Sequence, residues 1–123
     1  MPEVYQLSDA ILLRDISNVV ELFNDLNISE TNGFGLLSYI YNSVRGMIVY
    51  QLSKQANKTI VCEEYNVNVN FYKNAYRHAN RYNVVELQEF LYRLYQLELD
   101  IKIGKADLVN DLKFVVYDSV ARK

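Results

Sequence analysis

Apolar residues recur at intervals of three and four along almost the whole chain, and this spacing constrains the fold more than any other feature. Such spacing makes one face of an α-helix apolar, whereas a strand needs sustained alternation, which the sequence lacks. Helix breakers are scarce, because the 123 residues include one proline and four glycines. The pattern predicts an all-α fold, a single compact bundle of about six or seven helices over residues 1–123.

Turn and capping signals divide this pattern into segments. The expected helices lie at about 4–12, 16–26, 34–56, 60–65, 69–82 and 84–103 and from 108 onward, with a loop at 27–35. Four side chains are expected to cap the helices that follow them: Asp15, Asn68, Asn83 and Asp107. Glu86 completes a capping box with Asn83, and Gly104 can adopt the left-handed conformation that ends a helix.

Charge and cysteine content limit the classes of partner. The net charge of -2 and the pI near 5.4 differ from those of a dedicated nucleic-acid binder, whose affinity depends on a basic surface. Contact with DNA is therefore expected only locally and with help from partners. No apolar run approaches the roughly 18 residues that cross a bilayer, so no membrane partner is expected. Cys62 cannot form an internal disulfide and no export signal is visible, which favours the cytoplasm.

The sequence has almost no motif for nucleotide binding, metal binding or catalysis. A P-loop needs Gly-Lys followed by Ser or Thr, but Gly104-Lys105 is followed by Ala, and the glycines around Phe34 have no lysine after them. Both glycine sites are better explained as turns. One histidine, His78, and one cysteine, Cys62, are too few for a metal site or a nucleophilic centre. The sequence predicts no catalytic residues, no metal and no cofactor, and this domain is not expected to be an enzyme.

Three cations recur every four residues, Lys73, Arg77 and Arg81. On a helix they would stack along one side, where a partner or a DNA backbone could use them. The alternative is an ordinary solvated face opposite the stripe of Tyr72, Ala75, Ala79 and Tyr82.

Aromatic residues exceed what one core requires, since the chain has eleven tyrosines. Most are expected to pack in the core or at its boundary. Four look surplus and are candidates for covering by another subunit: Tyr39, Tyr50, Phe90 and Tyr95.

Four segments in a fixed order resemble the C-terminal domain of the delta subunit of the bacterial DNA polymerase III clamp loader. The first segment is residues 4–11, together with Arg14-Asp15 and 20–22. The second is the helix 36–45, with the pattern "Leu-Leu … apolar-Arg". The third is the basic segment 72–82, and the fourth is the closing segment 97–104 with Asp107. The helix that usually precedes the basic one departs from the family pattern at 61–65. The resemblance covers almost the whole chain, and its closing segment is the most specific.

The resemblance implies a collar module that packs beside the equivalent domains of the gamma or tau subunits and of delta prime. Its links to the sliding clamp and to primed DNA would be indirect, because the family's nucleotide-binding-type and clamp-binding modules lie upstream and are absent from residues 1–123. The parent subunit belongs to a nucleotidyltransferase complex, the DNA polymerase III holoenzyme. Arg45 joins the interface candidates, and Lys102 and Lys105 are candidates for lying near DNA.

A different class of function is also compatible with the pattern. The helices could form a stand-alone adaptor or a regulator that senses a small molecule in a pocket lined by Tyr41, Met47 and Phe90. An upstream nucleotide-binding-type fold in the parent gene would favour the collar.

Overall fold

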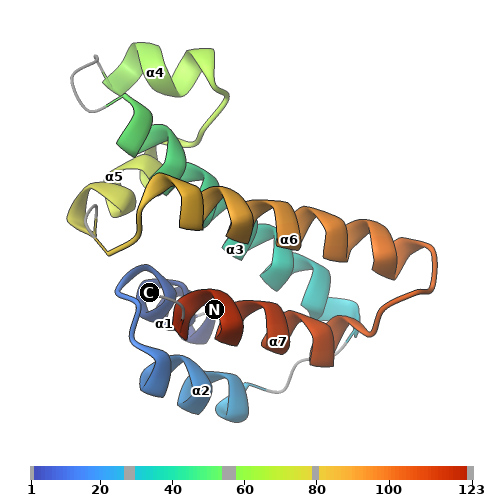
Figure 1. The fold of residues 1–123 in the computed structure, drawn as a ribbon. Coiled ribbons are helices and arrows are strands. Elements are labelled where there is room, and N and C mark those ends of the chain that lie inside the picture. Colours follow the sequence, from blue (N-terminus) through green and yellow to red (C-terminus); the bar gives the residue numbers. More distant parts are fainter. Residues whose placement is uncertain (1, 27–29, 54–57, 79–80, 122–123) are drawn as a thin grey trace.

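The structure is a computed structural model that describes residues 2–26, 30–53, 58–78 and 81–121. Within those ranges it contains seven helices and no strand, which confirms the all-α prediction. The helices are α1 (Pro2–Leu12), α2 (Ile16–Asp25), α3 (Glu30–Leu52), α4 (Lys58–Glu64), α5 (Val69–Arg77), α6 (Val84–Lys102) and α7 (Leu108–Ala121). In Figure 1, α6 crosses in front of α3. Helices α7 and α2 lie below α6, and α4 and α5 lie together at one end.

The helix ends follow the local signals in the sequence. The side chain of Asp15 accepts a hydrogen bond from the backbone N–H of Asn18, 3.2 Å away, and the Asn68 side chain accepts one from the N–H of Asn70 at 2.8 Å. Both caps satisfy backbone donors that have no partner inside the helix. The expected caps at α2 and α5 are therefore confirmed.

The start and end of α6 are also as expected. Asn83 and Glu86 form the reciprocal capping box, with bonds of 2.8 and 3.1 Å between side chain and backbone. Gly104 follows the helix with a φ of +78°, a conformation that side chains with a Cβ rarely adopt. Asp107 then caps α7 by accepting from the N–H of Asn110 at 3.3 Å.

The boundaries of α3 and the start of α4 differ from the expectation. The loop expected at 27–35 is helical from Glu30 onward, and residues 27–29 lie outside the described part. The two glycines in this stretch lower helix propensity, but the packing of Leu36 and Leu37 in the core outweighs that cost. At its other end α3 stops at Leu52, and residues 54–56 are not described. The short helix α4 begins at Lys58, two residues earlier than expected.

The fifth helix is shorter than predicted, because α5 ends at Arg77 with His78 as its C-cap. Tyr82 is still buried, at 4% exposed, but it reaches the core from the connection between α5 and α6. Ala79 lies outside the described residues. A shared apolar face therefore did not require one continuous helix.

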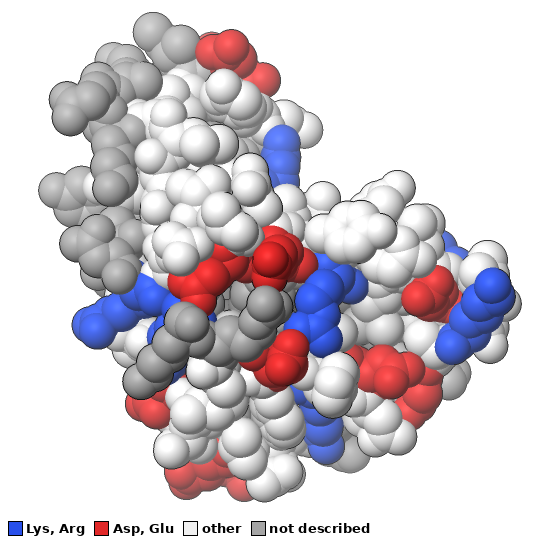
Figure 2. Space-filling model, viewed as in Figure 1, with Lys and Arg blue, Asp and Glu red and all other residues white. Residues whose placement is uncertain are grey.

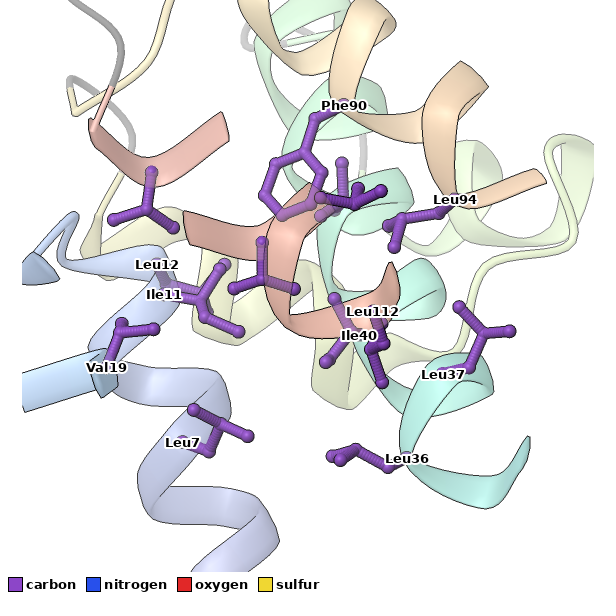
Figure 3. Close-up of a cluster of buried hydrophobic side chains, with 14 of the residues drawn as sticks. Leu7, Ile11, Leu12, Val19, Leu36, Leu37, Ile40, Phe90, Leu94 and Leu112 are labelled. Carbon is purple, nitrogen blue, oxygen red and sulfur yellow. The ribbon is translucent and has the colours of Figure 1, made fainter. Parts of the chain in front are cut away.

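Two hydrophobic clusters hold the fold together. The main core joins α1, α2, α3, α6 and α7 and includes Ala75 of α5. Figure 3 shows its side chains, among them Leu7, Ile40, Phe90, Leu94 and Leu112, converging between the helices. A smaller core lies between the end of α3, α4 and α5. Its buried members are Val49, Val61, Cys62, Val67 and Tyr72. We call α4 and α5 with this smaller core the small lobe.

A glycine lets the small lobe approach α3 closely. A Cβ at Gly46 would lie 3.0 Å from both the Cβ and the backbone oxygen of Phe71 on α5. A Cβ there would force Phe71 to move away by a few tenths of an ångström, so Gly46 allows this close approach of α5 to α3.

A partly buried arginine ties together segments from the two ends of the chain. Arg14 follows α1 with a φ of +59°, and its guanidinium makes three hydrogen bonds. They go to the carbonyl oxygens of Val120 at 2.9 Å and Arg81 at 3.0 Å, and to the Glu86 carboxylate at 2.5 Å. With the side chains of Arg14 and Glu86 only 11% and 21% exposed, this pair is largely desolvated.

Tyr82 covers the other side of this arginine. The Arg14 guanidinium carbon lies 4.5 Å from the centre of the Tyr82 ring, within the range of a cation–π contact. The Tyr82 hydroxyl donates to the carbonyl oxygen of Ile11, and burial of the ring raises the pKa of that hydroxyl well above its usual range. The hydroxyl therefore stays protonated and continues to donate.

We expect Arg14→Ala to lower the free energy of unfolding by about 3 kcal/mol, because it removes the guanidinium that pairs with one oxygen of the Glu86 carboxylate and donates to two carbonyl oxygens. The matched control is Arg93→Ala, which removes the more exposed Arg93–Asp118 pair and should cost about 1 kcal/mol or less. Urea unfolding followed by circular dichroism measures both. Equal costs for the two substitutions would contradict the role assigned to Arg14.

Candidate subunit interface

Helix α6 carries two apolar faces. The inner face packs in the main core through Leu87, Phe90, Leu94 and Leu97. On the opposite side, five large apolar side chains are 40% to 65% exposed: Val85, Tyr92, Tyr95, Leu99 and Ile103. We call these five residues the outer stripe.

The outer stripe follows from helix geometry. Each residue turns the helix by about 100°, so residues seven apart return to nearly the same side. Val85, Tyr92 and Leu99 have this spacing, while the core residues Phe90 and Leu94 point the other way. With 19 residues α6 is about 28 Å long, so the stripe runs along the length of a small domain.

A shallow groove beside α6 extends this apolar surface toward α7. The groove encloses about 340 Å³ and its lining is half apolar, including Tyr92, Leu97, Val115 and the 65% exposed Phe114 on its α7 side, and half charged or polar. Arg93 bridges the two helices, because its guanidinium lies 5.6 Å from the centre of the Phe114 ring and 2.5 Å from the Asp118 carboxylate. Figure 2 shows uncharged surface over part of α6, with charged side chains around it. Apolar patches rimmed by charges are typical of protein interfaces.

Tyr95 is the surplus aromatic residue that lies on this surface. It is 49% exposed within the outer stripe. Tyr50, in contrast, is half-buried, and its ring packs edge-on against Tyr72 with the centroids 5.5 Å apart. Much of the Tyr50 ring is thus packed against other residues of the domain.

The expectation that Phe90 meets another subunit is wrong. Its side chain is 1% exposed and fills the main core with Leu87, Leu94 and Leu97, to which it is related by helical spacing of three, four and seven residues. Met47 is also 1% exposed. Two of the three side chains expected to line a small-molecule pocket therefore fill the core.

The hydrogen bonds of Arg45 are made within the domain. Its guanidinium donates to the carbonyl oxygens of Tyr65 and Asn66, just after α4, and the bond to Asn66 is 2.9 Å long. Asn66 has a left-handed φ of +55°. Arg45 thus fixes the turn from α4 toward α5 from its position on α3.

Tyr39 lies between helices. Its ring centroid is 5.4 Å from that of Tyr5 on α1 and 5.2 Å from that of Phe71 on α5. Burial raises the pKa of the Tyr39 hydroxyl, and Tyr5 and Asp9 raise it further. The ring is half-buried, so part of it stays accessible.

The three cations expected on one helix face are not all on the same helix. Lys73 is exposed on α5, but Arg81 lies four residues beyond the end of that helix, where it is also exposed. The Arg77 side chain lies outside the described part. The prediction that Arg81 belongs to a basic face of the fifth helix is therefore wrong.

The two candidate DNA-proximal lysines flank the Gly104 turn and are both exposed. Lys102 forms an ion pair with Glu98 one turn earlier on α6, at 3.2 Å, and Lys105 lies along the groove between α6 and α7. Their positions leave both ammonium groups accessible to a large anion.

Within the described residues, no three or more His, Cys, Asp or Glu side chains are grouped so that they could hold a metal ion. None of the helices there is long and apolar enough to cross a membrane.

Comparison with known proteins gives two matches. Residues 2–118 match the family model of the DNA polymerase III delta subunit, C-terminal domain. Among solved structures, the fold is similar to that of the DNA clamp loader delta protein of Bacillus subtilis, with a TM-score of 0.75 and 19% sequence identity. That match covers 98% of this chain and 36% of the other, so the chain spans about a third of the length of that protein. No curated protein matches the sequence.

The two faces of α6 predict opposite responses to truncation. Leu94→Ala leaves a cavity in the main core and should lower the free energy of unfolding by about 2 to 5 kcal/mol. Leu99→Ala, on the outer stripe, should change it by about 0.5 kcal/mol at most, because that side chain has few contacts to lose. Urea unfolding of both variants measures the difference, and a large cost at Leu99 would mean that the stripe is packed within the domain.

Proposed function

We propose, from the premise that this chain belongs to the family of C-terminal domains of the DNA polymerase III delta subunit, that it is the collar module of a clamp loader. Its task is to position other modules and not to catalyse a reaction. In the whole delta protein, nucleotide-binding-type and clamp-binding modules precede residues 1–123, and the complete assembly works in the cytoplasm.

The outer stripe is the observation that carries this proposal. A lone domain gains nothing from five large apolar side chains turned to water on the side of α6 away from its core. A neighbouring collar domain that covers the stripe and the Phe114 groove would bury them. Aromatic side chains surrounded by charges have the composition of interface centres.

The partners that fit are the collar domains of gamma or tau and of delta prime. Packing side by side holds the mobile modules of these subunits at high effective concentration, so that a change in one reaches the next without dissociation. The sliding clamp and primed DNA are then linked to this domain only indirectly.

Replacing two stripe residues tests the interface. Tyr92→Ser combined with Ile103→Ser should leave the fold intact, because both side chains are more than 60% exposed. It should weaken association with the cognate gamma or tau and delta prime collar domains about thirtyfold or more, as loss of interface hot spots does. Co-elution of the full-length subunits in gel filtration is the measurement.

The matched control for this test is Tyr65→Ser, a tyrosine 48% exposed just after α4, which should leave co-elution unchanged. Assembly that survives the double substitution, and also survives deletion of residues 1–123 from the full-length protein, would remove the basis for a collar role.

We further propose that Lys102 and Lys105 lie near primed DNA in the assembled loader, because they flank the exposed Gly104 turn. Reversing both charges, Lys102→Glu with Lys105→Glu, should lower DNA-stimulated ATPase activity and make it less sensitive to salt, since two phosphate contacts are lost. Lys113→Glu is the control. An unchanged salt dependence would place the DNA elsewhere.

A further inference from the structure

A cavity of about 640 Å³ opens between α1, α3 and α5. In Figure 1, α5 lies at the opposite end of α6 from the turn that joins α6 to α7. The size of the cavity lies within the range of small-molecule sites. The residues that line it are Tyr5, Asp9, Leu13, Tyr39, Asn70, Lys73 and His78. The outer stripe contributes none of them.

One wall of this cavity is aromatic. Tyr5 is 55% exposed, and its ring is tilted by 59° against that of Tyr39. Phe71 packs against Tyr39 at 63°, so the Tyr39 ring is held between two others. The cavity therefore offers one fixed and one exposed ring to a flat partner, and stacking on such rings does not depend on the identity of a base.

Apart from the apolar Leu13, the remaining lining residues are polar and of mixed sign: Asp9, Asn70, Lys73 and His78. Asp9 lines the same cavity as Tyr5 and Tyr39, so a carboxylate lies near the rings. Asn70 and Lys73 are three residues apart on α5, so they lie on one side of that helix. With His78, the cavity thus combines three hydrogen-bonding side chains with an exposed ammonium group.

We propose that this cavity binds one nucleotide unit, with the base against Tyr5 and Tyr39, the base edge at Asp9 and Asn70, and the phosphate on Lys73. A carboxylate and an amide can together satisfy donors and acceptors of a base edge. The nucleotide is either free or an unpaired nucleotide of a DNA single strand, because both present the same base and phosphate. This site goes beyond the collar contact and does not depend on it.

Simpler ligands fit the lining less well. A basic side chain from a partner protein would be attracted by Asp9 and the rings but repelled by Lys73. A bare inorganic anion would be attracted by Lys73 but repelled by Asp9, and it would leave the rings unused. A nucleotide uses the rings, the hydrogen-bonding groups and the ammonium group at once.

Fluorescence anisotropy of a labelled DNA single strand of about twelve nucleotides, titrated with the complete chain, tests the proposal. Tyr5→Ala should weaken binding about tenfold through loss of one stacking surface. Lys73→Glu should weaken it as well and reduce the slope of log K against log salt by about 0.7, the value for one phosphate of a single strand.

Two control substitutions lie away from the cavity. Tyr65→Ala removes a tyrosine of similar exposure, 48%, and Lys113→Glu reverses a charge on α7, and neither should change binding. The far-ultraviolet circular dichroism of every variant is compared with that of the parent chain. Asp9→Asn, which removes a charge without removing the side chain, should change the preference among the four bases.

Competition with free nucleoside monophosphates identifies the source of the nucleotide. Displacement at micromolar concentration indicates a free nucleotide, whereas displacement only by oligonucleotides indicates single-stranded DNA, and either result supports the site. Absence of binding up to millimolar concentration would overturn the proposal, and so would equal losses in the control variants. Loss of co-elution with partner subunits in Tyr5→Ala, with DNA binding unchanged, would overturn it in favour of a protein ligand.

Discussion

The arrangement of this domain depends on one guanidinium, that of Arg14. It joins the turn after α1 to the last turn of α7 and to the start of α6, where its partners are 106 and 72 residues away in the sequence. Its partner Glu86 uses one carboxylate oxygen for Arg14 and the other for the Asn83 backbone, so the ion pair and the cap of α6 reinforce each other. Such a pair is retained only where every buried donor finds an acceptor. Because it fixes the start of α6, it also fixes which side of α6 faces the core and which faces outward.

Features that depend on a few neighbouring residues could be predicted from the sequence. The caps at Asp15, Asn68 and Asn83 and the stop at Gly104 are local matters of hydrogen bonding and backbone conformation, and all are confirmed. The start of α3 was missed because tertiary packing outweighs the low propensity of its glycines. The end of α5 was missed because Tyr82 reaches the core without a helix. The hydrogen bonds of Arg14 join residues that are far apart in the sequence, so no local pattern predicts them.

The candidate interface residues also include some whose position could be predicted from the sequence and some whose position could not. The excess of aromatic residues correctly indicated spare apolar surface, and Tyr95 lies on it, but Phe90 belongs to the core because its spacing to Leu87 and Leu94 is that of the buried face. The seven-residue spacing of Val85, Tyr92 and Leu99 was readable from the sequence and would have located the outer stripe. Arg45 could not be assigned in this way, because its acceptors are backbone carbonyls 20 and 21 residues away.

The small lobe has a consequence for motion. Among the side chains that the structure describes, its core has five buried residues, whereas the main core has many more, and the two are connected through α3 and through Ala75 of α5. Units with little buried apolar surface open at a lower free energy than the rest of a domain, so amide hydrogens of α4 and α5 should exchange with solvent while those of α6 and α7 stay protected. One wall of the nucleotide cavity comes from α5 and another from α1. Opening of the lobe would therefore change the width of that cavity, and a ligand that contacts both walls would slow amide exchange in α5.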